Sequence, residues 1–509
     1  GRISNRLDLR GTNCVVDAAC ASSFSAIHLA ALELISGRSD MVVTGGLDTL
    51  NDIFMHMCFS KTHTLSATGD ARPFSKDADG TVLGEGIGIV VLKRLESAQK
   101  DGNRIYAVIK GLGSSSDGKS QSIYSPSIEG QIRALRAAYK NAGINPATVG
   151  LIEAHGTGTR VGDKVEFKAL NRIFEESGAN GNKCALGSVK SMIGHTKASS
   201  GAAGLIKAAL GLYHKVLPPT LKAEVPDPEL DIENSHFYLN SSARPWFTGN
   251  GHPRRAGVSA FGFGGSNFHI VLEEYLSAKT EISWDGNIDI IAFSAARKND
   301  LIRSVKMYRD EVVNGLSDDQ FKIKAAESRK DFSIEHAYRL LMVHEHDFEK
   351  SEPFNRALKA LNSTGGRDSL NLKNIYIGGP EKAGKLAFVF PGQGSQYLGM
   401  GRDFVCTFPQ ALKILEDFNE KLRGRALLSD LIFPPPACST EERQRQEKAL
   451  KSTDIAQPAI GAVSLAMLKI LQKFAINPDA TCGHSFGEMT ALCAAGWIDE
   501  QALMTLSVT

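Results

Sequence analysis

The sequence has few cysteines, no long hydrophobic run and almost no net charge. It holds 8 cysteines in 509 residues, without a CxxC pair or a metal-finger spacing. We therefore expect no disulfide framework and no metal site, and a reducing cytoplasm fits best. No apolar run approaches the about 20 residues of a membrane-spanning helix, so we expect no membrane span. Lysine plus arginine total 58 and aspartate plus glutamate 56, which argues against binding nucleic acid through bulk charge.

The composition is that of a folded protein, with 42% hydrophobic residues and 49 glycines. Residues 1 to about 275 alternate β-rich runs such as NCVVDAAC, MVVTGG and FHIVLEE with helical runs, which predicts an α/β fold. Residues 276–384 are richer in charge and helix formers and predict a small helical or α+β connector. A second α/β pattern begins at Lys385. The chain does not begin with methionine, and we expect it to be a fragment of a longer protein.

The segment NCVVDAACASSFSAIHLAALELISG predicts a strand, a tight turn and a helix. Val15 and Val16 would supply the strand, and Cys20 would lie at or just before the helix N-terminus. The helix dipole and unpaired N–H groups there favour a thiolate, which lowers the pKa of a thiol. A buried structural cysteine is the alternative, and the local sequence gives the two interpretations equal weight.

Two histidines decide between these interpretations. His155 follows an apolar strand in LIEAHGTGTRVGD, and His195 follows Lys190 in LGSVKSMIGHTKASSGAAG. Either histidine alone would more often be structural. Two of them at strand ends, with a cysteine at a helix start, match a nucleophile with acid/base and oxyanion groups. A glycine-rich turn in AGVSAFGFGGSNFHIVLEE could aim N–H groups at an oxyanion.

These motifs, with ARPFSKDADGTVLGEG, resemble the β-ketoacyl synthases of the thiolase fold. The resemblance covers residues 1 to about 275 and corresponds to the C-terminal two-thirds of such a domain. It is closest to type I polyketide synthases, and within them to the polyunsaturated-fatty-acid-synthase branch. A thiolase would be expected to have a second cysteine in the motif GFGGSNFH, and initiation-type synthases have asparagine where His195 stands.

The resemblance implies a role for each residue. Cys20 would take an acyl group from the phosphopantetheine arm of an acyl carrier protein, and His155 and His195 would assist the decarboxylation of malonyl-carrier protein. Lys190 would hold the histidine environment electrostatically. The backbone N–H groups of Cys20 and Phe263 would form the oxyanion hole, and the Phe263 ring would gate the pocket. The resemblance further implies a homodimer and no directly bound cofactor.

A second nucleophile is predicted near the C-terminus. Ser485 stands in Gly-His-Ser-Phe-Gly, a G-x-S-x-G elbow in which glycines permit a strained turn. A turn serine that caps a helix is the alternative. With FVFPGQGSQYLGMG, this segment resembles the start of a malonyl-type acyltransferase with an α/β-hydrolase-like fold. Ser485 would then carry malonyl from coenzyme A to the carrier protein, and Gln393 would supply an oxyanion donor.

This second domain departs from its family in two respects. The catalytic histidine belongs well downstream of the serine, yet no histidine follows His484. The carboxylate-binding arginine of the family would also fall past Thr509. We therefore expect a truncated acyltransferase without malonyl transfer activity, with an exposed apolar face on residues 460–474.

The predicted organisation is a ketosynthase at 1–275, a linker at 276–384 and an acyltransferase start at 385–509. Two rival functions are a non-catalytic dimerisation scaffold with the ketosynthase fold and a serine hydrolase at 385–509. Arg254 and Arg255 form a basic spot that would contact a carrier protein or lie in a solvated loop.

Two further signals are rejected. Residues 113–120 satisfy the P-loop pattern, but a Pro follows where a helix should begin. The His-Glu-His run at 344–346 has a spacing that diverges on a helix, which does not favour a metal site.

Overall fold

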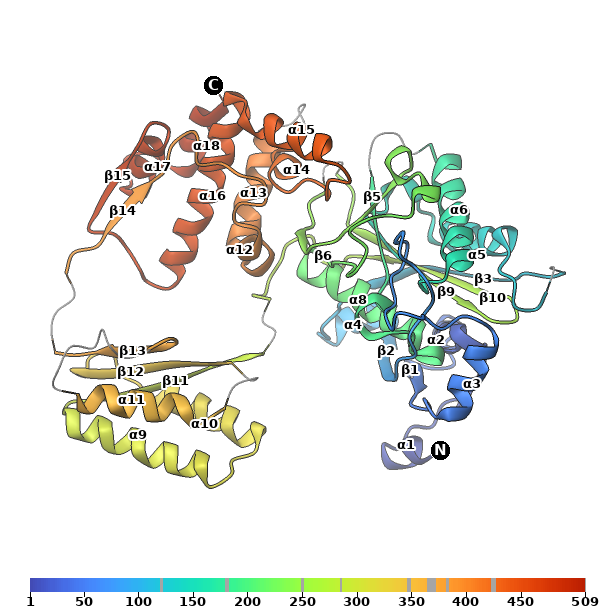
Figure 1. Cartoon of the computed structure of the whole chain (residues 1–509), viewed down its shortest axis with the longest axis horizontal. Coiled ribbons are helices and arrows are strands. Elements are labelled where there is room, and N and C mark those ends of the chain that lie inside the picture. Colours follow the sequence, from blue (N-terminus) through green and yellow to red (C-terminus); the bar gives the residue numbers. More distant parts are fainter. Residues whose placement is uncertain are drawn as a thin grey trace. The chain divides into compact units, whose positions relative to one another are not determined.

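The computed structural model describes the whole chain except residues 120–121, 179–182, 249–250, 284–285, 346–348, 364–371, 381–383, 423–426 and 509. The chain forms two compact units (Figure 1). The first comprises Gly1–Ile282 and Ala387–Thr509, and the second comprises Ser283–Leu386.

A six-stranded mixed sheet organises the N-terminal part of the first unit. Its strands, in their order across the sheet, are β3 (Val108–Ser116), β10 (Ser266–Glu273), β9 (Arg255–Gly262), β4 (Leu151–Glu153), β5 (Cys184–Gly187) and β7 (Phe237–Leu239). The pairs β3–β10 and β10–β9 are antiparallel, and the pairs from β9 to β7 are parallel. The parallel half is the part that places side chains at the carboxyl ends of β4 and β5.

Helices cover both faces of this sheet. Successive side chains of a strand point to opposite faces, so one strand contributes to the core on each side. In β4, Leu151 packs into the core formed with α2 (Ser22–Ile35) and α8 (Ser200–His214). The next residue, Ile152, packs into the core formed with α5 (Ile128–Ala142) and α6 (Arg160–Glu176). Figure 1 shows these two helix pairs on opposite sides of the strands.

Shorter elements complete the N-terminal part. They are α1 (Arg2–Arg6), η1 (Ala19–Ala21), α3 (Ile53–Lys61), α4 (Leu95–Lys100), η2 (Pro146–Thr148), α7 (Lys190–Ile193), η3 (Lys197–Ser199), β6 (Val216–Leu217), η4 (Pro228–Leu230), η5 (Ile232–Asn234) and β8 (Arg244–Pro245). The strand predicted at Val15 and Val16 is wrong: these residues lie in irregular backbone, and Val15 is 98% exposed. A strand requires a hydrogen-bonded neighbour, and the described residues provide none there.

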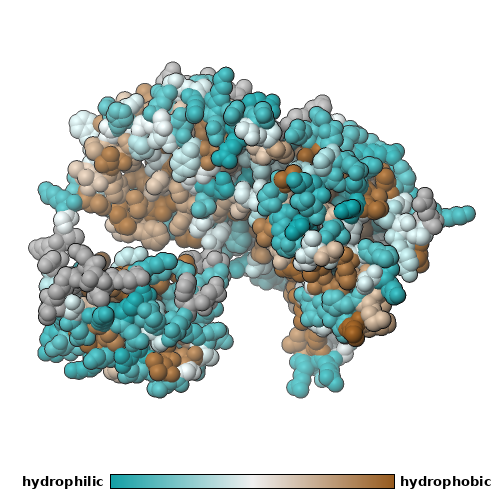
Figure 2. Space-filling model, viewed as in Figure 1, coloured by the Kyte–Doolittle hydropathy of each residue, from teal (hydrophilic) through white to brown (hydrophobic). Residues whose placement is uncertain are grey.

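An antiparallel pair, β1 (Met41–Asp48) and β2 (Gly86–Lys93), lies beside α2 and α8. One face of the pair packs on these helices. The other face carries exposed hydrophobic side chains, and Figure 2 shows hydrophobic residues on this part of the surface. They are Met41, Val43, Leu47, Ile87, Ile89 and Val91. A contiguous apolar face of this kind is typical of an interaction surface.

The second unit is an α+β sandwich, as predicted for the connector. Its antiparallel sheet has the order β11 (Ile288–Ala295), β12 (Tyr338–Glu345) and β13 (Ile375–Gly378). The helices of this unit are α9 (Lys298–Val313), α10 (Asp318–Asp331) and α11 (Glu352–Asn362), which supply its core together with the sheet.

The C-terminal part of the first unit surrounds a parallel strand pair, β14 (Ala387–Phe390) and β15 (Ala480–Gly483). Its helices are α12 (Arg402–Thr407), α13 (Pro409–Lys421), α14 (Leu428–Ile432), α15 (Thr440–Lys451), α16 (Thr453–Lys473), α17 (Gly487–Ala494) and α18 (Glu500–Val508). The expected exposed face on residues 460–474 is wrong for most of that segment, because α13 and α18 pack against α16 and bury its apolar side chains.

Helix α16 is also the one helix, among the described residues, long and apolar enough to cross a membrane. It has 21 residues and a mean hydropathy of 1.4 over its most apolar window. In the structure, 67% of that window is buried inside the protein. Its composition is therefore accounted for by its place in a core, and one such helix is weak evidence for a membrane span.

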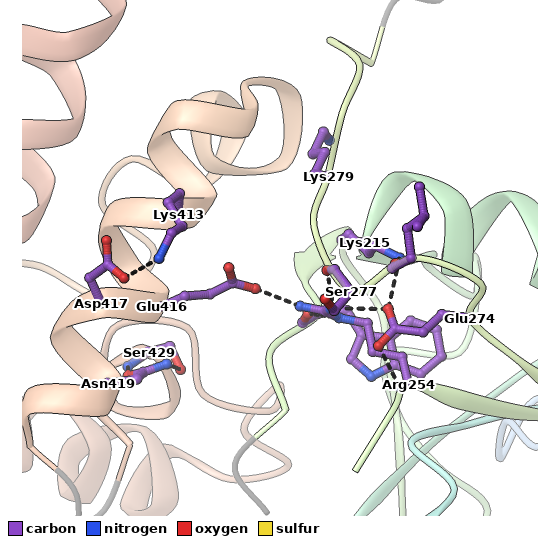
Figure 3. Close-up of polar contacts among 12 residues, drawn as sticks. Lys215, Arg254, Glu274, Ser277, Lys279, Lys413, Glu416, Asp417, Asn419 and Ser429 are labelled. Atoms are coloured by element: carbon purple, nitrogen blue, oxygen red, sulfur yellow. Dashed lines mark hydrogen bonds and ion pairs between the residues drawn. The ribbon is translucent and has the colours of Figure 1, made fainter. Parts of the chain in front are cut away.

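The two parts of the first unit meet at a set of buried charges (Figure 3). The predicted basic spot is wrong for Arg254, whose side chain is 2% exposed. It donates hydrogen bonds to Glu274 at 2.9 Å, to the carbonyl of Trp246 at 2.6 Å and to Glu416 of α13 at 2.8 Å. Arg255 instead pairs with Glu273 at 2.9 Å. A buried guanidinium needs such partners, because an unpaired charge is costly to desolvate.

Two more cations of the N-terminal part contact the C-terminal helices. Lys279 donates to the carbonyl of Cys406 in α12, and Arg244 donates to the carbonyl of Phe433, which follows α14. Both carbonyls belong to helix C-terminal ends, where cations are favourable. Three basic residues thus join the two sequence segments of this unit.

Candidate active sites

Cys20 lies in the short turn η1, directly before α2, and is 5% exposed. Ala19 has a φ of 51°, a left-handed conformation that costs energy for a residue with a Cβ. The Ser22 hydroxyl closes the turn by donating to the carbonyl of Ala19 at 2.7 Å and accepting the N–H of Ala18 at 2.9 Å. The thiol is therefore held by a strained and well-bonded turn at the start of a helix.

The predicted lowering of the pKa of Cys20 is wrong. Burial raises the pKa of this thiol above its ordinary value. The positive charge of Lys190 and hydrogen bonds from the backbone N–H groups of Phe263 and Cys20 act in the opposite direction, but burial is the larger effect. The two N–H groups predicted as oxyanion donors thus both favour the thiolate form.

His155 and His195 lie next to each other, with ring centroids 5.4 Å apart and ring planes at 84°. Both are buried, and burial, reinforced by the charge of Lys190, lowers the pKa of each imidazole well below its usual value. Both rings are therefore neutral near pH 7. The N–H of Lys197 donates to Nδ1 of His195 at 3.2 Å, so the neutral ring carries its proton on Nε2. That tautomer presents an N–H donor.

Lys190 is 3% exposed and donates to the carbonyl of His155. It lies among buried carboxylates that the sequence interpretation missed, Asp163 and Glu166 on α6. Glu166 accepts the N–H of His155 at 2.8 Å, and Asp163 accepts the N–H of Gly158 at 3.1 Å. Burial raises the pKa of each carboxyl to about 7, and burial lowers the pKa of Lys190. Asp163 and Glu166 are three residues apart, directly after a glycine-rich turn, and this spacing places them on one helix face. The spacing was the signal in the sequence that could have identified them.

Phe263 lies in the turn between β9 and β10 and is 39% exposed. Its ring contacts those of Phe59 at 6.2 Å and Tyr124 at 5.9 Å between centroids. Its backbone N–H acts on the pKa of the buried Cys20 thiol, so the turn that carries this exposed ring lies near the predicted nucleophile.

Ser485 follows β15 and precedes α17, in the strand–turn–helix arrangement predicted for it. Its φ of 55° is left-handed and its side chain is exposed, as an elbow requires. A Cβ on Gly487 would lie 2.2 Å from the carbonyl oxygen of Phe390, and one on Gly483 would lie 2.2 Å from Gly487. Only glycine fits at either position.

Gln393 lies on the loop after β14. Its neighbour Gly392 packs against the elbow, because a Cβ on Gly392 would lie 2.9 Å from the Cβ of Ser485. The Gln393 amide donates to Thr453 at 3.1 Å and accepts from Gln457 at 3.4 Å. Its side chain is thus held by α16.

No group of three or more histidine, cysteine, aspartate or glutamate side chains could hold a metal ion in the part of the chain that the structure describes. Of the His-Glu-His run, His344 is buried in β12 beside Phe321, and His346 lies outside the described residues.

Four protein-family models match the chain. They are the β-ketoacyl synthase N-terminal domain at residues 1–98, its C-terminal domain at 106–224, the ketoacyl-synthetase C-terminal extension at 226–340 and the acyl transferase domain at 387–506. The chain contains β-ketoacyl synthase and acyl transferase domains. The resemblance drawn from the motifs around Cys20, His155, His195 and Ser485 is thereby confirmed, and both domains are of the transferase class.

Relatives of the ketosynthase–acyltransferase chain are large synthases. The chain is 38% identical to a polyunsaturated fatty acid synthase polypeptide of Thraustochytrium sp. over 99% of its own length and 19% of that protein. It is 34% identical to polyketide synthase GfsE of Streptomyces halstedii over 97% of its length and 13% of that protein. The chain therefore spans less than a fifth of these two relatives.

Solved structures support the fold of the ketosynthase part. A ketosynthase from module 6 of the bacillaene synthase of Bacillus subtilis matches with a TM-score of 0.53 and 33% identity, over 74% of this chain and 64% of that one. The oxazolomycin ketosynthase domain from Streptomyces albus matches with a TM-score of 0.53 and 31% identity, over 74% of this chain and 64% of that one. The predicted layered, thiolase-like α/β fold is confirmed.

Proposed function

We propose that the ketosynthase site performs a decarboxylative Claisen condensation with Cys20 as the nucleophile. The observation that carries this proposal is the pair of buried, neutral imidazoles of His155 and His195 at 5.4 Å, together with a buried Cys20 thiol that is influenced by the same Lys190 as both imidazoles. Neutral N–H donors suit a reaction that develops negative charge without a strong base.

In the first step, the sulfur of Cys20 attacks the thioester carbonyl of an acyl carrier protein. The carbonyl oxygen becomes an oxyanion that accepts from the N–H groups of Cys20 and Phe263. The carrier thiolate then leaves and takes up the proton that the Cys20 thiol gives up. Because burial raises the pKa of the thiol and the thiolate is the nucleophile, the proton has to leave the sulfur as the carbonyl is attacked.

In the second step, the malonyl group of a second carrier protein loses carbon dioxide. The electron pair of the broken C–C bond passes to the thioester carbonyl, whose oxygen is stabilised by N–H donors of His155 and His195. The resulting enolate carbon bonds to the acyl carbon on Cys20, and the Cys20 sulfur leaves and regains a proton. Lys190 positions the histidines through the His155 carbonyl.

The acyltransferase part would transfer malonyl from coenzyme A to the carrier protein through an ester on Ser485, with Gln393 as an oxyanion donor. This activity needs a base beyond those in the chain, because a serine hydroxyl is a weak nucleophile alone and no histidine follows His484. We accordingly expect no rapid malonylation of the 509-residue chain. The proposed partners are an acyl carrier protein and a second ketosynthase, which the exposed β1–β2 face supports, in the cytoplasm.

Acyl loading tests the central assignment. The chain is incubated with an acyl N-acetylcysteamine thioester and its intact mass is measured. One acyl group is expected on the wild type and none on Cys20→Ala, while the matched variant Cys14→Ala, which removes an exposed cysteine, should still load. Loading of Cys20→Ala would refute the nucleophile. Absence of loading on every variant would favour a non-catalytic scaffold.

The histidine roles are tested in a synthase that carries this chain with its carrier protein. His195→Ala should still accept an acyl group on Cys20 but release little carbon dioxide from malonyl-carrier protein. Unchanged carbon dioxide release would show that decarboxylation does not depend on this ring.

A further inference from the structure

A cavity of about 570 Å³ lies in the first unit, where the two sequence segments of that unit meet. Its wall contains the side chains of Arg244, Arg402 and Arg443. Among the described residues that line it there is no aspartate or glutamate. Three guanidinium groups around one polar cavity favour an anionic ligand, and above all a phosphate, whose geometry matches the guanidinium fork.

The three arginines differ in how they are held. Arg244 is 7% exposed and fixed by the carbonyl of Phe433 and the hydroxyl of Tyr238, at 3.0 and 2.6 Å. Arg402 makes no ion pair within the described part of the chain. Among the described residues, Arg443 has a surface contact with Glu447 at 3.3 Å, in which both side chains are well exposed. One arginine is therefore preorganised, and the other two have guanidinium groups that a ligand could engage.

Helix α15 begins at the same cavity, which Ser439 and Thr440 also line. Ser439 is the N-cap residue, and the N-terminal end of a 12-residue helix adds partial positive charge. The acids of the first turn of this helix are Glu441 and Glu442, and Glu442 accepts the N–H of Cys438 at 2.8 Å. The charged residues that line the cavity, among those the structure describes, are all arginines.

The cavity wall is connected to the serine elbow by one loop. Gly392 packs against Ser485, and seven residues later Gly399 lines the cavity. Seven residues span at most about 25 Å even when fully extended, so an elongated ligand could reach from one place to the other.

We propose that this arginine cavity binds the phosphate groups of the phosphopantetheine-bearing substrate that the acyltransferase part uses. The assignment rests on the proposed function for its substrate class, and on the three guanidinium groups for its site. The phosphates belong either to coenzyme A or to the arm of a carrier protein, and both present a phosphate ester.

Binding of coenzyme A to the full chain, measured by isothermal titration at low ionic strength, tests the site. Arg402→Ala and Arg443→Ala should each weaken binding roughly tenfold or more, since each removes a charge-assisted contact. The matched control is Arg445→Ala, an exposed arginine on the same helix that does not line the cavity, and it should change affinity less than about twofold. Equal affinity of all three variants and the wild type would overturn the proposal.

Three further arms identify the ligand. Inorganic diphosphate should displace coenzyme A from the wild type, and pantetheine without phosphate should not bind measurably; tight binding of pantetheine would overturn the proposal. Coenzyme A that binds much more tightly than 4′-phosphopantetheine assigns the site to the coenzyme, and equal binding assigns it to a carrier arm. Ser485→Ala should bind coenzyme A like the wild type, so a failure of malonyl transfer leaves this test intact.

Discussion

Two neighbouring acids on α13 offer a direct test of the junction in Figure 3. Glu416 pairs with the buried Arg254, whereas Asp417 pairs with the exposed Lys413 four residues earlier on the same helix. Glu416→Ala therefore removes the ion pair with the buried arginine, and Asp417→Ala removes the ion pair with the exposed lysine. Asp417→Ala is the control at the adjacent position, and it gains somewhat more helix propensity than Glu416→Ala, because aspartate is a weaker helix former than glutamate.

The expected magnitudes follow from burial. Removing one partner of a buried pair costs about 3–5 kcal/mol when the remaining charge is left bare. Arg254 is 2% exposed but keeps Glu274, and Glu416 is 31% exposed, so we expect Glu416→Ala to lower the free energy of unfolding by about 2 kcal/mol. The side chains of Lys413 and Asp417 are 66% and 26% exposed, and loss of that pair should cost about 0.3–0.5 kcal/mol.

Urea unfolding of the full chain, followed by circular dichroism, measures both differences. Glu416→Gln should recover part of the loss, because its amide oxygen can still accept from the guanidinium. Equal losses for Glu416→Ala and Asp417→Ala would refute the reasoning, since they would show that Arg254 does not depend on α13.

Three further outcomes follow from the same geometry. Stability should fall as pH rises from about 4 to 7, by at most about 1.4 kcal/mol per pH unit for each group, because Asp163 and Glu166 have pKa values of about 7 when folded and bind protons that the unfolded chain releases. Asp163→Asn, followed by urea unfolding across this range, should flatten the slope, and an unchanged slope would contradict the assignment. Lys190→Met should impair carbon dioxide release more than acyl loading, and equal impairment in the two assays would count against a positioning role. Gly487→Ala should lower the thermal midpoint of the acyltransferase part, because its Cβ would lie 2.2 Å from the Phe390 carbonyl oxygen; an unchanged midpoint would show that the elbow relaxes freely.

The sequence predicted those elements whose pattern is local. The runs MVVTGG and FHIVLEE correspond to β1 and β10, and the elbow at Ser485 has the strained backbone that its glycines indicate. The strand expected at Val15 does not form, because strand formation depends on a partner that a local pattern does not identify. Arg254 was misjudged for a related reason: its partners Glu274 and Glu416 are 20 and 162 residues away in the sequence.

At the candidate ketosynthase site, the residue types were predictable and their ionisation was not. Helix position alone indicated a lowered pKa for Cys20, but the pKa depends on how completely the thiol is removed from water. The carboxylates Asp163 and Glu166 were passed over because acids on a helix are ordinarily solvated. Only the packing of α6 against the glycine-rich turn after β4 shows them to be buried and bonded to backbone N–H groups.

Burial acts on the nucleophile and on the histidines of this site in opposite senses. It makes the Cys20 thiolate harder to form, and it keeps His155 and His195 neutral although Lys190 lies beside them. A more exposed site would ionise the thiol more easily but would replace the fixed N–H donors by water, which must reorganise as charge develops. Acyl exchange between two thiols consumes no proton overall, because the proton lost by the attacking thiol is regained by the departing thiolate. Decarboxylation has no such exchange and depends on donors already in place. The burial of this site therefore favours the decarboxylation step over ionisation of the free enzyme.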